Sequence, residues 1–145
     1  MKKYELTDDT ITVGGRILHR IKALKSFSDV EEGDLGGYVE KEDNLDHSGE
    51  AWVSGEAWVS GDARVSGDAR VSGENDYAAA KGFGREYRTT TFFRLQDGGI
   101  GVRCGCFCGT LEEFREKVKE THKESKMGKE YLMLADLMEY KFKNA

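Results

Sequence analysis

Arginine, threonine and phenylalanine residues gather between residues 82 and 107, where they follow a Gly-x-Gly-Arg loop at residues 82–85. Guanidinium groups and threonine hydroxyls are suited to bind phosphate or carboxylate. The rings of Phe92 and Phe107 could stack on a nucleotide base. In an acidic chain, this basic segment is the feature that most needs a functional explanation. The residues that we predict to bind a ligand are Arg85, Arg88, Thr90, Phe92, Arg94 and Arg103.

A β-hairpin is expected to position these residues, because Asp97-Gly98-Gly99 is a strong turn signal. A two-residue turn within this tripeptide directs one set of side chains to the core: Thr89, Thr91, Phe93, Leu95, Ile100, Val102, Cys104 and Cys106. The opposite face then carries the arginines with Thr90 and Phe92 and is open to a ligand. The alternative is that the arginines pair with the glutamate-rich C-terminal helices or pack against the preceding repeat.

The cysteines Cys104, Cys106 and Cys108 alternate within the same segment, and His122 could supply a fourth metal ligand. Structural zinc sites usually separate paired cysteines by two to four residues and add a second pair later in the chain. Here a single residue separates them, and the predicted hairpin turns two of them toward the core, where a free thiol packs as a small apolar group. We therefore predict no metal and no other cofactor. The odd number of cysteines suits a reducing compartment.

Residues 49–73 consist of four copies of a six-residue unit (Gly, acid, Ala, Trp or Arg, Val, Ser) and a closing glycine. A hexapeptide period is typical of a parallel β-helix, in which three units form one turn. The alanine and valine of each unit alternate with outward residues, as a strand buried on one face requires. Degenerate units precede the perfect ones, so we expect about two turns, with both ends capped.

Residues 18 apart are expected to stack on successive turns of this β-helix, which places Trp52 beside Arg70. By the same spacing, Asp46 lies beside Arg64. Trp52 and Trp58 occupy outward positions, and tryptophan is enriched at subunit interfaces. We therefore predict that at least one of them contacts another subunit of a homo-oligomer. The alternative is that the N-terminal segment of the same chain folds over them.

These patterns divide the chain into three segments. Residues 1–38 are expected to cap the β-helix, residues 39–75 to form it, and residues 76–145 to form a small α+β domain. In that domain a Thr-Leu-Glu-Glu capping box at residues 110–113 starts one helix, and an amphipathic pattern predicts a second helix over residues 129–142. The predicted fold class is therefore mainly β with α: a short parallel β-helix followed by an antiparallel hairpin and two helices.

Composition limits the classes of function. The 145 residues carry a net charge of −5, which argues against general binding to the nucleic acid backbone, because such binding requires a basic surface. The N-terminus lacks the apolar core of a signal peptide, and no apolar run is long enough to span a membrane. We therefore expect a cytoplasmic protein with no membrane contact and no bulk nucleic acid partner.

Hexapeptide β-helices are widely used by acetyltransferases, whose catalytic histidine lies between the subunits of long prisms. Here the candidate histidines are His19 and His47, but about two turns leave little wall for an extended cofactor. His47 falls in a valine position or at the edge of a turn, which favours a structural role. We predict no catalytic residues and keep a hexapeptide-repeat acyltransferase as an alternative.

Residues 18–45, the hexapeptide run and residues 89–122 together resemble a group of small bacteriophage and prophage proteins, described as hexapeptide-repeat or β-helix proteins of unknown function. The first and last segments are more specific than the repeat, and the resemblance covers nearly the whole chain. It implies a left-handed β-helix followed by an α+β domain, encoded by a phage and acting in the cytoplasm of a bacterial host cell. It implies no active site.

By analogy with viral proteins that counter host defence, we predict a non-catalytic oligomeric binding protein, an anti-defence sponge that sequesters a small phosphorylated or nucleotide signal. Fold alone does not decide function, so two alternatives stay open. One is a structural or protein-binding module that inhibits a host factor, with Trp52 and Trp58 facing the partner. The other is the acyltransferase. A site with arginine, threonine and aromatic groups but no base favours the binding protein.

Overall fold

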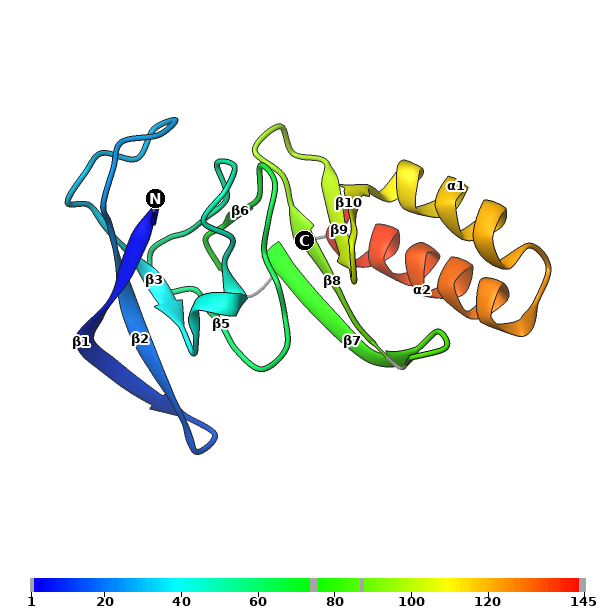
Figure 1. Ribbon diagram of the computed structural model, residues 1–145, viewed down its shortest axis with the longest axis horizontal. Coiled ribbons are helices and arrows are strands. Elements are labelled where there is room, and N and C mark those ends of the chain that lie inside the picture. Colours follow the sequence, from blue (N-terminus) through cyan, green and yellow to red (C-terminus); the bar gives the residue numbers. More distant parts are fainter. Residues whose placement is uncertain (1, 74–75, 87, 144–145) are drawn as a thin grey trace.

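The computed structural model describes residues 2–73, 76–86 and 88–143. The molecule is elongated, and its parts follow one another along the long axis in chain order (Figure 1). A β-hairpin lies at one end and the repeat lies in the middle. A second sheet separates the repeat from a pair of helices at the other end. This second sheet therefore connects the two halves of the molecule.

The N-terminal sheet has the strand order β1-β2-β3-β5. β1 (Tyr4–Val13) and β2 (Arg16–Ala23) form an antiparallel hairpin, and β3 (Leu35–Val39) lies antiparallel to β2. β5 (Trp58–Val59), which belongs to the repeat, pairs in parallel with β3. The sheet therefore joins the repeat to the N-terminal segment through main-chain hydrogen bonds.

The prediction of a left-handed parallel β-helix is wrong for the described part of the chain. The repeat contributes strands of two residues, β4 (Trp52–Val53), β5 and β6 (Arg70–Val71). β4 and β6 form a separate two-stranded sheet, whereas β5 joins the N-terminal sheet. The N-terminal sheet combines antiparallel and parallel pairs, and the sheets neither curl nor close into a solenoid. The physical reason is that β2 pairs antiparallel with β3 and so takes the edge on which a further parallel turn would have to stack.

The inward alternation within the repeat is confirmed. Its alanines and valines are all at most 4% exposed, namely Ala51, Val53, Ala57, Val59, Ala63, Val65, Ala69 and Val71. Trp52 pairs with Arg70 across β4 and β6, at the predicted spacing. The predicted neighbour of Asp46 is wrong, because the adjacent Leu45 bridges Val65 and not Ala63. Asp46 instead forms an ion pair with Arg103 of the second sheet, with 3.1 Å between Oδ2 and Nη1.

The second sheet is an antiparallel meander. It consists of β7 (Tyr77–Phe83), β8 (Arg88–Arg94), β9 (Ile100–Cys104) and β10 (Phe107–Thr110), paired in that order. Ala69 of the repeat forms an antiparallel bridge to Leu95, just after β8. The second sheet is therefore attached to the repeat at the end of its second strand.

The β8–β9 hairpin forms as predicted, but the predicted register is wrong by one residue. Phe92 pairs with Val102, and the loop holds residues 95–99 in place of a two-residue turn. A shift of one residue moves the side chains of a strand to the other face. Phe92 and Thr90 therefore share a face with Val102 and Cys104. That face, predicted to be open to a ligand, packs against the helices.

Two helices cover this face of the second sheet (Figure 1). α1 (Leu111–His122) begins at the predicted capping box, in which the Thr110 hydroxyl accepts from the Glu113 amide at 3.2 Å and the Glu113 carboxylate accepts from the Thr110 amide at 2.9 Å. α2 (Lys126–Lys143) contains the second predicted helix. Within the described residues, neither helix is long and apolar enough to cross a membrane.

Two hydrophobic cores lie on the two sides of the second sheet. The first core is formed by the N-terminal sheet and the repeat, and Phe93 of β8 is part of it. The second core lies between the sheet and the helices and includes Phe92, Phe114 and Tyr131. The predicted boundaries of the three sequence segments stay a prediction.

Candidate functional site

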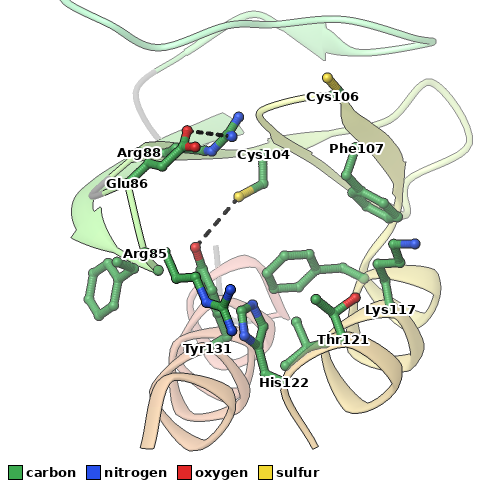
Figure 2. Close-up of a pocket in the computed structure, with 14 residues that line it drawn as sticks. Arg85, Glu86, Arg88, Cys104, Cys106, Phe107, Lys117, Thr121, His122 and Tyr131 are labelled. Carbon is green, nitrogen blue, oxygen red and sulfur yellow. Dashed lines mark hydrogen bonds and ion pairs between the residues drawn. The ribbon is translucent and has the colours of Figure 1, made fainter.

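A cavity of about 530 Å³ lies between the second sheet and the two helices. We call it the aromatic cavity. Its walls come from the end of β7, the loop before β8, the β9–β10 hairpin and both helices (Figure 2). The side chains that decide its chemistry are Arg85, Arg88, Phe107, Lys117, His122 and Tyr131.

Aromatic rings form much of the cavity wall. The ring of Phe114 lies 5.8 Å from that of Phe107 and 5.6 Å from that of Tyr131, measured between centroids. Phe83 lies 6.2 Å from Tyr131. These tilted and edge-on contacts hold each ring in one orientation. Phe114 and Tyr131 are 3% and 5% exposed, so the apolar ring surface open to a flat ligand comes mainly from the half-buried Phe83 and Phe107.

The hydroxyl of Tyr131 is a neutral hydrogen-bonding group in this wall. Its oxygen lies 3.8 Å from Cys104 Sγ, and the Thr90 hydroxyl donates to the same sulfur at 3.4 Å. Burial, together with the neighbouring Cys104 thiol, raises the pKa of Tyr131. The phenol therefore stays protonated at neutral pH and can donate to a ligand.

Positive charge surrounds the aromatic cavity. Arg85, Arg88 and Lys117 line it together with the imidazole of His122, and Glu86 is the one acidic residue among its described lining residues. Arg88 Nη2 donates to Glu86 Oε2 at 2.6 Å. Lys117, on the helix side, therefore has no carboxylate partner among the described lining residues. Figure 2 shows Arg88 beside the sheet and Lys117 on α1. An anionic group would therefore meet cations from both walls.

The β9–β10 turn places Arg88 at the edge of the cavity. Cys104 pairs with Phe107, so the turn holds Gly105 and Cys106. Gly105 has a φ of 60°, which suits the first central position of a type II′ turn. A Cβ atom at this position would clash with the Arg88 guanidinium. Glycine therefore lets Arg88 lie against the turn backbone.

No family model matches the chain, and no curated protein matches it. The resemblance to phage hexapeptide-repeat proteins therefore stays a prediction. Function has to be argued from the chemistry of the cavity itself.

The structure brings Arg85 and Arg88, of the six predicted ligand-binding residues, to the aromatic cavity. Thr90 and Phe92 are buried at 0% exposure. The ring of Phe92 packs edge-on against Phe114 at 6.0 Å, so it cannot stack on a ligand as predicted. The one-residue difference in register is the reason, because it turns this ring into the second core.

The two remaining arginines lie elsewhere. Arg94 donates to the Asp76 carboxylate at 3.1 Å and to the Phe142 carbonyl at 3.0 Å. It therefore ties β8 to the end of α2 through a main-chain carbonyl, whereas its ion pair is with Asp76, outside the helices, and not with a helix glutamate. Arg103 lies beside a different cavity, on the side of the repeat.

The two tryptophans have different environments. Trp52 is 4% exposed and packs edge-on against Phe27, with 5.4 Å between ring centroids, and against Tyr4 at 6.5 Å. The N-terminal segment thus folds over Trp52, so its ring is not available to a partner as predicted. Trp58 is half-buried, and its role at a subunit interface stays a prediction.

The cysteines do not share one face. Cys104 is half-buried, whereas Cys106 and Cys108 are exposed. The prediction that Cys106 faces the core is wrong, because the turn ends the strand before this residue. Among the described residues, no group of histidine, cysteine and acidic side chains is arranged to hold a metal ion.

Phe107, which the sequence named with Phe92 as a ring that could stack on a base, lines the cavity. Several other lining residues were not predicted to bind a ligand, namely Phe83, Phe114, Lys117, His122 and Tyr131. A signal for part of this set exists in the sequence. Phe114, Lys117, Val118 and Thr121 follow the spacing of one helix face, and this face carries a lysine and a threonine next to apolar residues. Helix amphipathicity alone could not show that the sheet leaves space above that face.

Proposed function

We propose that the protein is a non-catalytic binding protein for a small phosphorylated or nucleotide ligand, held in the aromatic cavity. One observation carries the proposal: a wall of aromatic rings lies next to Arg85, Arg88, Lys117 and His122 in a single cavity. The rings would stack on a base, which contributes about 1–3 kcal/mol for each stacked base. Arg85, Arg88 and Lys117 would bind the phosphate through charge-assisted hydrogen bonds.

The contacts within the cavity support binding in place of catalysis. The Cys104 thiol interacts with Thr90 and Tyr131, and His122 packs against the ring of Tyr131 at 5.5 Å. The thiol and the imidazole are thus each engaged with Tyr131. Nucleophilic catalysis would require the nucleophile and the base to be hydrogen-bonded to each other.

The biological role that we propose is sequestration of a nucleotide signal by a phage protein in the cytoplasm of a host cell, as an anti-defence sponge. The proposal combines the sequence resemblance with the chemistry of the cavity. A sponge must bind its ligand without turning it over, and a preformed ring wall reduces the entropy lost on binding. We also propose that the protein acts as a homo-oligomer.

Native mass spectrometry tests this function on protein purified from cells with and without an active nucleotide-signalling defence system. We expect an additional mass of nucleotide size that is released on denaturation. The Lys117→Ala variant should lose this mass, whereas Lys119→Ala should keep it, because Lys119 lies on the same helix and does not line the cavity. A protein-only mass in both kinds of cell would refute the proposal.

A protein-binding module is the second candidate, and an exposed apolar stripe on α2 favours it. Met133, Leu137 and Tyr140 are 70%, 57% and 71% exposed, and their spacing places them on one helix face. Exposed apolar patches of this kind mark interaction surfaces. If the native mass shows no small ligand, capture of a host protein that depends on Leu137 would support this candidate.

A further inference from the structure

A second cavity, of about 580 Å³, lies where the repeat meets the edge of the second sheet. We call it the basic cavity. Lys41, Asp43 and residues 62–64 form one wall, and Lys81, the start of β8 and the β9–β10 hairpin form the other. It shares Arg88 and Cys106 with the aromatic cavity. The two cavities therefore adjoin at the β9–β10 turn.

The lining of the basic cavity is strongly positive. Its five cationic side chains come from separate parts of the chain, and the two acidic residues that accompany them are Asp43 and Asp62. The cations are Lys41, Arg64, Lys81, Arg88 and Arg103. In a chain with a net charge of −5, this concentration of positive charge in one hollow favours an anionic ligand.

Arg103 is held in position by the protein. Its side chain is 19% exposed, and its Nη1 lies 3.1 Å from Asp46 Oδ2. Its Nε donates to the Gly105 carbonyl at 3.0 Å. On the other side of the cavity, Asp62 lies 3.0 Å from Lys81 Nζ and 3.5 Å from Lys41 Nζ. The single carboxylate of Asp62 thus faces two ammonium groups, so one positive charge of this pair of lysines is not neutralised by it.

Arg64 differs from these anchored cations. Its backbone amide donates to the Thr91 hydroxyl at 2.9 Å, and Thr91 is 1% exposed, so the position of Arg64 is well defined. Its side chain is exposed and lines the cavity. No acidic residue of the described chain forms an ion pair with its guanidinium. Its hydrogen-bond donors are therefore available to a ligand.

We infer that the basic cavity binds a chain of two or more phosphate groups. Cations from opposite walls fit several anionic groups in sequence better than they fit a single one, and a guanidinium fork matches the oxygens of a phosphate. The volume lies within the range of cavities that hold a small ligand. Because Arg88 borders both cavities, a nucleoside polyphosphate could occupy the two together. This last step rests on the proposed function, whereas the phosphate-chain site does not.

Isothermal titration of the full chain with inorganic tripolyphosphate tests the site without a nucleoside. We expect saturable binding that weakens as the salt concentration rises, because the contacts are ionic. Arg64→Ala should weaken binding about tenfold, as loss of a hydrogen-bonded charge predicts. Lys22→Ala is the control, since Lys22 is an exposed cation of β2 that does not line the basic cavity, and it should bind normally.

The chain-length requirement has its own test. Inorganic orthophosphate should bind at least tenfold more weakly than tripolyphosphate, and equal affinities would overturn the inference. Absence of tripolyphosphate binding, or equal binding by Arg64→Ala and the unchanged protein, would overturn it as well. Lys117→Ala, which alters only the aromatic cavity, should leave tripolyphosphate binding unchanged. The phosphate-chain site and the nucleotide proposal can therefore fail independently.

Discussion

Phe92 and Phe93 are consecutive residues of β8 that enter different hydrophobic cores. They are 0% and 1% exposed, respectively. Phe92 packs with the two helices, and Phe93 packs with the repeat and the N-terminal sheet. Successive side chains of a strand point to opposite faces, so β8 supplies one large ring to each side of the sheet. The second sheet is thus buried on both faces at this point.

We predict that Phe92→Ala and Phe93→Ala each lower the free energy of unfolding by about 3–5 kcal/mol, the usual range for truncating a buried phenylalanine. Hydrogen exchange should distinguish the two variants. Phe92→Ala should accelerate amide exchange in α1 and α2 more than in β4 to β6, and Phe93→Ala should have the reverse effect. Identical exchange maps for the two variants would contradict the assignment to separate cores.

The buried Lys3 makes stability depend on pH. Its side chain is 0% exposed and donates to the Ala51 carbonyl at 2.6 Å. Burial lowers the pKa of Lys3 from 10.5 to about 8. Between these values the unfolded chain binds more protons than the folded chain, so the free energy of unfolding should rise with pH. Urea denaturation should show a gain on the order of 1–3 kcal/mol across this window.

The gain in stability from Lys3 should end near pH 10, and a variant of Lys3 tests its source. Burial also raises the pKa of Tyr4 above its usual value of 10.0; because the unfolded tyrosine ionises first, stability should fall again above about pH 10. Lys3→Met should abolish the rise between pH 8 and 10, whereas Lys2→Met, at an exposed position, should retain it. A rise of equal size in both variants would rule out Lys3 as its source.

Gly105→Ala should disturb both cavities. The residue has a φ of 60°, and a Cβ would clash with the Arg88 guanidinium. We expect a loss of about 1–3 kcal/mol of stability, the usual cost of a strained backbone position, and weaker binding of both tripolyphosphate and nucleotide. Gly98→Ala is the matched control: its φ is 90°, but no other atom lies within 4 Å of the added Cβ. Normal ligand binding by Gly105→Ala would argue against the assigned position of Arg88.

The proposed homo-oligomer needs a contact surface, and the exposed apolar stripe on α2 (Met133, Leu137 and Tyr140) is a candidate for it as well as for a host protein. We expect Leu137→Glu to reduce the mass measured by sedimentation equilibrium, because a charge would replace an apolar contact. Lys119→Glu on α1 is the control for a general effect of added negative charge. If the protein is monomeric, or if both variants keep the same mass, the stripe is not the oligomer contact.

Local patterns in the sequence predicted those features that depend on nearby residues. The alternation of alanine and valine in the repeat correctly identified its inward side chains. The Thr-Leu-Glu-Glu box correctly located the start of α1. Both depend on short-range geometry, namely the alternating direction of side chains along a strand and the reach of a threonine hydroxyl to an amide three residues later.

Register and cavities required the whole chain. The residues of the β8–β9 turn allowed several loop lengths, and the five-residue loop turned Phe92 inward when the turn signal had placed it outward. Two of the six predicted ligand-binding residues line the aromatic cavity. The register buries Thr90 and Phe92, and Arg94 and Arg103 pair with Asp76 and Asp46 instead. The type of residue at one position does not reveal which other element of the chain will pack opposite its side chain.

By itself, the sequence determined which side chains of the repeat are buried, where α1 begins and where two helices lie. The tertiary structure decided which other elements bury the inward side chains of the repeat. A six-residue period states which residues turn inward, but the main-chain hydrogen bonds of each short strand go to whichever strand the rest of the chain places alongside. Here β2 pairs with β3, and the repeat divides between two sheets. The second sheet borders the basic cavity on the side of the repeat and the aromatic cavity on the side of the helices.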